Sequence, residues 1–314
     1  KKKLYQLLQW INEFEKNIDD IYEYYGVSKN FNIKKLWYPK IKGDFLFYTF
    51  AIFIYLFFNK KFDLVYGRFL HGCYIATLLK YQVIFESHRP MYEKNNYELR
   101  VFKKFIKSKY LKKFIVISNA LKKMYLENGC LNDSKIQVEH DGADKVEDLK
   151  SKIELLGSKN KLKIGYVGHL YKGRGINTII ECAKQINDMT FHIVGGLPED
   201  VEYWKKYSKK LSVSNVYFYG FISPKETIKY RNSFDIFLAP YSQQVSVVGI
   251  KDTSRYMSPI KIFEYMSHNK PIIASDLMAL REVLNSNNSI LVKSDNINEW
   301  INAIKELKDP EKRK

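Results

Sequence analysis

The stretch that decides the fold is SRYMSPIKIFEYMSHNKPIIASD, residues 254–276. Ser258 and Pro259 stand just before an apolar periodic run. This is the pattern of a helix start with Ser258 as N-cap and Pro259 as the first helical residue. A short apolar run at 271–275 follows and predicts a strand. Helices that alternate with fully apolar strands are typical of a parallel sheet covered on both faces.

The predicted helix at 258–268 begins with an unexpected charge. A capping box places an acid three residues after the N-cap, as the chain does with Glu226 after Ser223, but Lys261 fills this slot after Ser258. A cation is unfavourable among the free N–H groups of a helix start. An ion pair with Glu264 would contribute only a few tenths of a kcal/mol, in the less favourable orientation. We therefore interpret Lys261 as part of an anion site.

The second half of the chain alternates short β-rich runs with amphipathic stretches. The predicted strands are 163–168, 191–196, 216–221, 235–240, 271–275 and 289–292. The predicted helices are 176–186, 198–211, 223–233 and 258–268. This order predicts a doubly wound α/β domain with a parallel sheet.

The first half repeats the theme less regularly. Strands are predicted at 63–68, 83–88, 114–118 and 136–141, and helices at 70–81, 97–112 and 119–128. A charged stretch with weak periodicity separates the halves, so we divide the chain into domains at 1–145 and 162–314 with a linker at 146–161. Two doubly wound domains facing across a cleft would bind a ligand at the carboxyl ends of their strands.

Composition limits the choice of partners. The 314 residues carry a net charge of +18, which points to anionic partners, although a general bias toward lysine explains it equally well. The three cysteines, Cys73, Cys130 and Cys182, lie far apart and indicate neither a disulfide framework nor a zinc site. The apolar run at 45–58 is shorter than the ~18 to 20 residues of a membrane span and is expected to be a core helix.

A glycine-rich stretch, YVGHLYKGRGINTII, follows the first strand of the second half. Its glycines, Gly168 among them, would let a backbone approach a phosphate, and Arg174 adds a cation beside the N–H groups of the next helix. A plain turn with solvated cations is the alternative. Together with Lys261, the stretch favours a bound diphosphate. Glu264, one turn further along its helix, could accept from ribose hydroxyls or simply be solvated.

These segments carry a resemblance to a known family. The stretches SPIKIFEYMSHNKPIIASDLMALREVL, VGHLYKGRG and FHIVGG resemble glycosyltransferase family 4, which comprises retaining nucleotide-sugar transferases with the GT-B fold. The stretches VYGR, FESH, ISNALKKMY and VEHDGAD resemble the acceptor-side half of that family. The likeness covers most of residues 60–294. It implies a first, acceptor-side domain and a second domain that binds the nucleotide-sugar.

The resemblance implies roles for individual residues. Arg174 and Lys261 would contact the donor diphosphate as catalytic cations, Glu264 would hold the ribose as the second glutamate of an E-x7-E motif, and His88 would lie near the transferred sugar. The remaining donor-binding positions are Gly168, His169, Ser258 and Ile260.

The chain also departs from the family pattern. Tyr256 replaces the first glutamate of E-x7-E, which leaves the loop 249–254 to read the sugar. His169 stands where the family often has an arginine. The pattern further predicts a strand and glycine loop ahead of residue 1 and a return helix after residue 314, and we therefore expect a chain truncated at both ends.

The expected function is transfer of a hexose from a nucleotide-sugar co-substrate to a glycan or lipid-linked acceptor in surface polysaccharide synthesis. No D-x-D triplet occurs, so no metal and no further cofactor is expected. Two alternatives stay open: a catalytically inactive GT-B partner subunit, and a basic nucleic-acid-binding protein, although no recognition motif supports the latter.

The first domain also predicts a location. The apolar run 45–58 with Lys60 and Lys61, and the basic and apolar stretch 100–114, predict reversible binding to an anionic membrane surface. We therefore expect a cytoplasmic enzyme, peripheral at the inner membrane face. A helix that packs in the core, with lysines that are merely solvated, is the alternative.

Overall fold

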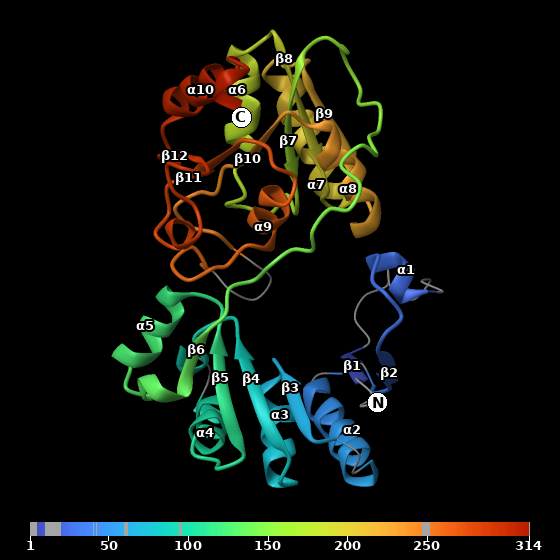
Figure 1. Ribbon diagram of the computed structural model, residues 1–314, viewed down its shortest axis with the longest axis vertical. Helices are drawn as coiled ribbons and strands as arrows, with labels where there is room; N and C mark the ends of the chain where they lie inside the picture. Colours follow the sequence, from blue (N-terminus) through green and yellow to red (C-terminus); the bar gives the residue numbers. More distant parts are fainter. Residues whose placement is uncertain are drawn as a thin grey trace. The chain divides into compact units, whose positions relative to one another are not determined.

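The computed structural model describes residues 5–9, 20–39, 41, 43–59, 62–93, 96–246 and 252–313 (Figure 1). The chain divides into two compact units, Lys1–His140 and Asp141–Lys314. Each unit is built around a parallel β-sheet.

The second unit contains a six-stranded parallel sheet in the order β12-β11-β10-β7-β8-β9. The strands are β7 (Leu162–Val167), β8 (Met189–Val194), β9 (Val216–Gly220), β10 (Ile236–Ala239), β11 (Ile272–Ser275) and β12 (Ile290–Val292). Every residue of β8, β10 and β11 is buried, as expected for apolar strands covered on both faces. The strands predicted for this half are confirmed.

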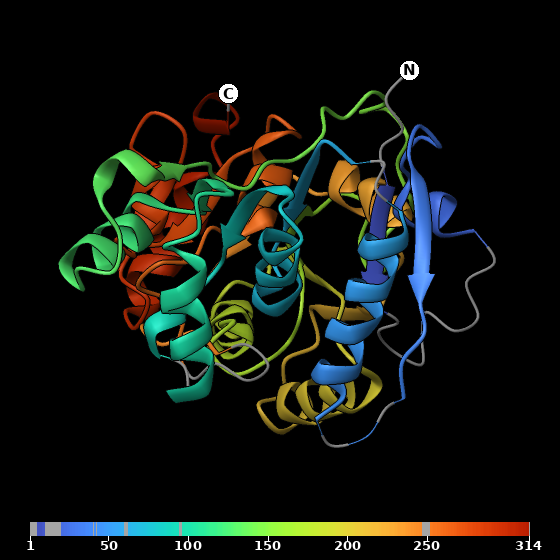
Figure 2. The same ribbon diagram turned by 90° about the horizontal axis from the view of Figure 1, so that it is seen from below.

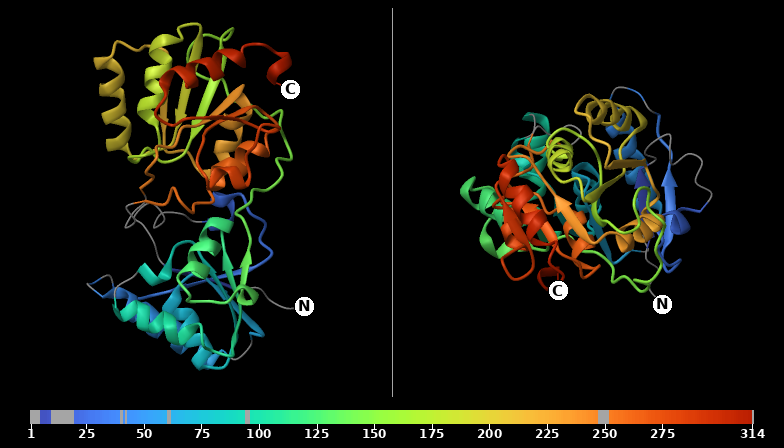
Figure 3. Two further views of the ribbon diagram at one scale, coloured as in Figure 1. Left: turned by 90° about the vertical axis from the view of Figure 1, so that its left-hand side faces the viewer. Right: turned by 90° about the horizontal axis from the view of Figure 1, so that it is seen from above.

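Helices cover both faces of this sheet. They are α6 (Ile176–Gln185), α7 (Pro198–Lys210), α8 (Pro224–Ser233), α9 (Ile260–Met266) and α10 (Ile297–Glu306). One buried cluster joins the sheet to α6, α7 and α10, and a second joins it to α8 and α9. Helices α6 and α10 pack against each other (Figure 3). The doubly wound arrangement is therefore present in this unit.

The strand order reverses between β7 and β10. From β7 the chain steps outward to β8 and β9, then crosses back through α8 and continues from β10 on the other side of β7. The loops that leave the carboxyl ends of β7 and β10 lead to helices on opposite faces of the sheet, α6 and α9. Such a reversal opens a crevice where doubly wound proteins bind ligands.

The two Ser-Pro helix starts behave differently. Helix α8 begins as predicted, with Ser223 at the N-cap position, although the serine side chain makes no capping hydrogen bond. The prediction for α9 is wrong by one residue, because Pro259 is at the cap position and Ile260 is the first helical residue. The Ser258 hydroxyl accepts instead from the backbone N–H of Asp141 at 3.1 Å. It therefore anchors the incoming chain beside the helix start.

The first unit contains a four-stranded parallel sheet in the order β3-β4-β5-β6. Its strands are β3 (Leu64–Gly67), β4 (Gln82–Ser87), β5 (Leu111–Val116) and β6 (Ile136–Val138), connected by α3 (Leu70–Leu78), α4 (Asn96–Phe105) and α5 (Asn119–Glu127). Phe85, Phe102, Phe105, Phe114 and Tyr125 form an aromatic cluster between the sheet, α4 and α5. This cluster is the centre of the unit's core.

The structure describes further elements outside these two sheets. Strands β1 (Tyr5–Gln9) and β2 (Asn32–Leu36), which the sequence patterns did not predict, form a separate parallel pair, with α1 (Ile21–Tyr25) between them in the chain. Helix α2 (Asp44–Phe58) follows and lies beside β2 (Figure 2). Short 3₁₀ helices occupy Met91–Glu93, Asp133–Lys135, Leu280–Glu282 and Glu311–Arg313.

The predicted helix at 97–112 is too long. Helix α4 ends at Phe105, a turn closes with the N–H of Leu111 donating to Ser108 O at 3.2 Å, and β5 begins there. A single interfacial helix over 100–114 is therefore not formed. Its apolar residues Phe102 and Phe105 are fully buried, so they pack into the core and do not face a membrane.

Helix α2 differs from the core helix predicted at 45–58. Its buried residues are Tyr48, Ile52 and Leu56. The remaining faces expose large apolar side chains: Leu46, Phe47, Phe50, Ile54, Phe57 and Phe58. Lys60 and Lys61 lie outside the described residues. Among the described residues, no helix combines the length and the apolar character needed to cross a bilayer. Helix α2 is therefore packed on one side and apolar on the other.

Candidate functional site

Glycines hold the loops after β7 and β10 together at the reversal of the sheet. Gly175 has a φ of 76°, and a Cβ at this position would lie 1.6 Å from the carbonyl oxygen of Pro240. The N–H of Ser242 donates to Gly173 O at 3.0 Å. The glycine-rich stretch therefore packs closely against the loop that follows β10.

Lys261 reaches into this site from the first turn of α9. Its Nζ lies 3.8 Å from the centre of the Tyr166 ring and 5.2 Å from that of Tyr241. A Cβ on Gly168 would come within 2.7 Å of Nζ, so the glycine leaves room for the amine. Nζ is buried and has no hydrogen-bond partner among the described residues. The pair with Glu264 considered above is not formed.

Arg174 also lies near the Tyr241 ring. Its Cζ lies 5.4 Å from the centre of the Tyr241 ring. Arg174 Nε and the Tyr241 hydroxyl are buried and, within the part of the chain that the structure describes, make no hydrogen bond of good geometry, although the guanidinium is close enough to counteract the rise that burial causes in the pKa of Tyr241. With Lys261 Nζ, three buried polar atoms at one place are unsatisfied. Such atoms are rare in native proteins and require an explanation, of which a bound ligand is one.

The electrostatics of the site are those of crowded positive charge. Burial lowers the pKa of the Lys261 amine well below its ordinary value, and Arg174 lowers it further, whereas Glu264 acts in the opposite direction. Desolvation, Arg174 and Lys261 also lower the pKa of His169. His169 is therefore neutral at pH 7. It stacks on Tyr171 with ring centroids 4.7 Å apart.

Glu264 has a protein partner that the sequence did not predict. Its Oε1 lies 3.2 Å from Nη1 of Arg231, whose side chain is only 6% exposed. Nη1 also donates to the hydroxyl of Thr227 at 3.1 Å. The Glu264 side chain is 30% exposed. It can therefore balance the buried guanidinium and still offer an oxygen to a ligand.

The other predicted donor-side residues fall around the start of α9. Ile260 is 52% exposed at the first helical position, and Ser258 is occupied by Asp141 as described above. Tyr256, at the position of the family's first glutamate, is buried at 4% exposure. Of the loop 249–254, residues 249–251 lie outside the described residues.

In the first unit, His88 follows the carboxyl end of β4. Its Nε2 is hydrogen-bonded to Oε1 of Glu86, and Arg68 Nη2 lies 2.6 Å from the same oxygen. The Tyr66 hydroxyl donates to Oε2 of Glu86. Glu86 itself is 7% exposed. The sequence pattern gave no reason to single out Glu86, although its place two residues before His88 on a strand puts both on one side.

The backbone around His88 is also fixed. The Tyr125 hydroxyl, from α5, donates to the carbonyl oxygen of Arg89 and accepts from the N–H of Met91, both at 2.9 Å. It also lies 2.9 Å from Ser87 Oγ. The turn that carries His88 is thus bound to a buried side chain of the core.

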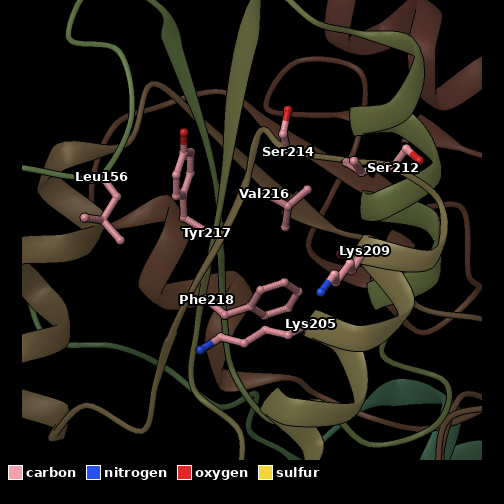
Figure 4. Close-up of a pocket in the computed structure, with 10 residues that line it drawn as sticks. Leu156, Lys205, Lys209, Ser212, Ser214, Val216, Tyr217 and Phe218 are labelled. Atoms are coloured by element: carbon pink, nitrogen blue, oxygen red, sulfur yellow. The ribbon is translucent and has the colours of Figure 1, made fainter.

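A cavity of about 510 Å³ lies elsewhere in the second unit (Figure 4). It is lined by the start of the edge strand β9, from Val216 to Phe218, and by Lys205, Ser208 and Lys209 at the end of α7. The start of β9 is at the amino ends of the strands, opposite the glycine loops. None of the predicted site residues lines this cavity.

The structure therefore brings Gly168, His169, Arg174 and Lys261 together at the strand reversal, with Glu264 one turn along α9. Tyr166, Tyr241 and Arg231 belong to the same site and were missed by the sequence analysis. Residues 161–309 match the family described as Glycosyl transferases group 1. This segment is a glycosyl transferase group 1 domain.

Two curated relatives are also named as glycosyltransferases. A glycosyltransferase of Methanocaldococcus jannaschii is 26% identical over 68% of this chain and 56% of its own length. The teichuronic acid biosynthesis glycosyltransferase TuaH of Bacillus subtilis is 27% identical over 39% of this chain and 29% of its own length. The chain thus spans about half the length of the first relative and less than a third of the second.

Solved structures share the fold over most of the chain. HepE of Anabaena, in complex with UDP and glucose, has a TM-score of 0.67 at 17% identity and covers 90% of this chain and 78% of its own. Sucrose-phosphate synthase of Thermosynechococcus elongatus has a TM-score of 0.65 at 18% identity, covering 90% and 76%. Both are GT-B proteins, and the predicted GT-B fold is confirmed.

Proposed function

We propose that this chain is a retaining glycosyltransferase that takes a hexose from a nucleoside diphosphate donor. One observation carries the proposal: Lys261 Nζ, Arg174 Nε and the Tyr241 hydroxyl are buried at the strand reversal without partners among the described residues. Three donors around a positive site suit the oxygens of a diphosphate. The UDP bound to HepE, a protein of the same fold, supports this choice of ligand.

Each residue of the site would then have a separate role in binding the donor or in stabilising the departing diphosphate. Negative charge grows on the diphosphate as the bond to the sugar breaks, and Lys261 and Arg174 would stabilise it together with the N–H groups at the start of α6. Because Gly168 has no side chain, the Lys261 amine has room beside it. The exposed oxygen of Glu264 would accept from the ribose, and Ser258, Ile260 and His169 would line the donor.

We also propose that transfer retains the configuration of the sugar and needs no metal. The donor phosphate would accept the acceptor's proton as the new bond forms on the same face of the sugar, and fixed cations would replace a metal clamp. Turnover should therefore persist in EDTA. Activity that EDTA abolishes and magnesium restores would contradict this part of the proposal.

For the acceptor we propose a glycan or lipid-linked saccharide of a surface polysaccharide, bound by the first unit with His88 near the transferred sugar. The relative named for teichuronic acid biosynthesis supports this class. The exposed apolar side chains of α2, Phe50 and Phe57 among them, would rest on the inner face of the cytoplasmic membrane. The charge of +18 would add attraction to anionic lipid.

Flotation with vesicles tests the membrane assignment. Anionic vesicles should carry the protein at low salt and release it at high salt, and Phe50→Ser with Phe57→Ser should weaken the association. Tyr203→Ser is the matched control, because Tyr203 is a 61% exposed aromatic residue of the second unit. If vesicles of either charge fail to carry the protein, a soluble acceptor replaces the membrane-bound one.

Calorimetry and a transfer assay test the central proposal. UDP, GDP or ADP should bind more tightly than its nucleoside, and one sugar donor should release its nucleotide with retention, seen by NMR of the product. Binding without turnover would identify an inactive partner subunit. Retention on phosphocellulose without any nucleotide binding would identify a nucleic-acid-binding protein instead.

A further inference from the structure

We propose that Glu86 is a positioning residue that holds the ring of His88 with Nε2–H toward the carboxylate and Nδ1 free to accept a hydrogen bond from a sugar hydroxyl. This inference rests on the proposed function for the identity of the sugar. It assigns a role to a carboxylate in the first unit that the donor site does not use.

The hydrogen bonds of Glu86 fix which nitrogen of His88 carries the proton. Oε1 meets Arg68 Nη2 at 2.6 Å and His88 Nε2, while Oε2 accepts from Tyr66. A carboxylate that faces a guanidinium is an ion, and an ionised carboxylate only accepts hydrogen bonds. Nε2 must therefore donate. In the neutral imidazole Nδ1 then carries the lone pair.

Burial separates this arrangement from an ordinary surface pair. Glu86 is only 7% exposed, so its carboxylate charge is buried. The His88 side chain, in contrast, remains 32% exposed. Buried carboxylates are costly unless their hydrogen bonds are satisfied. The three donors from Tyr66, Arg68 and His88 satisfy this one, and the ring of His88 keeps access to a ligand.

The main chain of His88 is fixed independently of its ring. The flanking Ser87, Arg89 and Met91 all meet the Tyr125 hydroxyl, directly or through their backbone groups. A histidine held at its backbone by the core and at its ring by a buried carboxylate has little orientational freedom. Such fixed groups can be complementary to a reacting sugar without first being ordered.

The chemistry required of Nδ1 is acceptance of a hydroxyl proton in a hydrogen bond. A sugar presents several hydroxyl donors, and a neutral Nδ1 can accept from one of them. With the opposite tautomer the ring would present an N–H to the sugar instead. Glu86 would thus act on transfer only through His88.

Nitrogen-15 NMR of histidine-labelled full-length protein tests the geometry. When its ring is neutral, His88 of the wild type should be the Nε2–H tautomer. Glu86→Gln, whose amide can donate to Nε2, should lose this preference. Tyr66→Phe is the matched control, since it removes a bond to Glu86 without touching the ring. A wild-type Nδ1–H tautomer, or one unchanged in both Glu86→Gln and Glu86→Leu, would overturn the inference.

Kinetics supply the second readout. Glu86→Gln should lower kcat on the order of 10-fold or more, because the wrong tautomer cannot accept the hydroxyl, while calorimetric UDP binding stays unchanged. Glu86→Asp should recover part of kcat and of the tautomer preference. Unchanged kcat with an altered tautomer would overturn the inference. Absence of UDP binding in the wild type would instead contradict the proposed function and leave the tautomer result to decide the geometry.

Discussion

The amine of Lys261 lies 3.8 Å from the centre of the Tyr166 ring, with no hydrogen-bond partner among the described residues. A cation above an aromatic face is attracted by the ring's quadrupole, by about 0.5–2 kcal/mol. That attraction does not replace the hydrogen bonds to water that the amine has lost. The ligand-free site is therefore incompletely satisfied, and an anion would complete it.

Replacing Lys261 by Met should separate binding from stability. We expect UDP to bind about 10- to 100-fold more weakly, because a hydrogen bond to a charged group contributes about 1.5–3 kcal/mol. The melting temperature of the ligand-free protein should not fall, since an apolar side chain of similar size replaces a buried amine that has no hydrogen-bond partner among the described residues.

Lys225→Met is the matched control for this change. Lys225 also stands in the first turn of a helix with a Ser-Pro start, but it is exposed. Calorimetry should find its UDP affinity within about 2-fold of the wild type, as for most surface substitutions. If Lys261→Met lowers the melting temperature as much as a core mutation does, Lys261 is a structural residue and the anion site is wrong.

Donor binding should take up a proton. Because burial and Arg174 lower the pKa of Lys261 in the ligand-free protein, a bound diphosphate will raise it again. Affinity for UDP should therefore fall as the pH rises from the lowered pKa of the ligand-free amine toward the raised pKa of the ligand-bound amine. The sign for stability is opposite: the unfolded chain binds more protons in this window, so ligand-free stability rises with pH.

The measurement is the binding enthalpy in buffers of different ionisation enthalpy. Wild-type protein should show proton uptake that increases with pH across this range, and Lys261→Met should show none. Equal enthalpies in all buffers at every pH would mean that the amine is already charged without ligand.

The pair of Glu264 and Arg231 should be structural as well as functional. Glu264→Leu leaves a buried guanidinium uncompensated and should lower the free energy of unfolding by about 3 kcal/mol. Adding Arg231→Met should restore at least half of the loss, because the unpaired charge is then gone. Urea unfolding of the four proteins in this cycle measures the coupling. Additive losses would show that the two side chains do not interact.

Lys270 should stabilise the end of α8. Its Nζ donates to the carbonyl oxygens of Arg231 at 3.2 Å, Asn232 at 2.7 Å and Phe234. Burial, and then Lys152, lower its pKa to about 8, so the amine is charged at pH 7. Lys270→Met leaves these carbonyls without the amine and should cost about 1–3 kcal/mol.

Lys229→Met is the control for Lys270, because Lys229 pairs with Glu226 on the surface of the same helix. Such exposed pairs contribute about 0–1 kcal/mol. Thermal melts at pH 7 should therefore show a much smaller loss for Lys229→Met. Equal losses from both variants would refute the capping role.

The strands of the second unit could be predicted because each is a short apolar run between helix signals. Predictions from local sequence patterns failed where a side chain pairs with a residue that is distant in the chain. The hydroxyl of Ser258 bonds to Asp141, 117 residues earlier, so the cap moved to Pro259. Glu264 is balanced by Arg231 of another helix. Asp141 and Arg231 do not stand at helical or strand spacing from Ser258 and Glu264, so no sequence pattern points to these pairs.

The position of Lys261 was informative for a different reason. A cation at a helix start conflicts with the helix dipole, so the sequence alone singled out Lys261. Its aromatic surroundings, Tyr166 and Tyr241, could not be predicted, since tyrosines in strands and loops usually serve the core. Helix α2 was predicted as a helix, but its exposed faces were not, because an apolar run carries no information about which faces are covered.

The loops at the strand reversal take their path from backbone contacts. A Cβ at Gly195 would lie 2.2 Å from the carbonyl oxygen of Gly168, just as Gly175 is fitted against Pro240. The side chains at positions 172 and 174 take no part in these two backbone contacts. A library that randomises these two positions should consequently retain folded members in high yield. The backbone of these loops can thus stay the same while variants that prefer different anionic groups are selected.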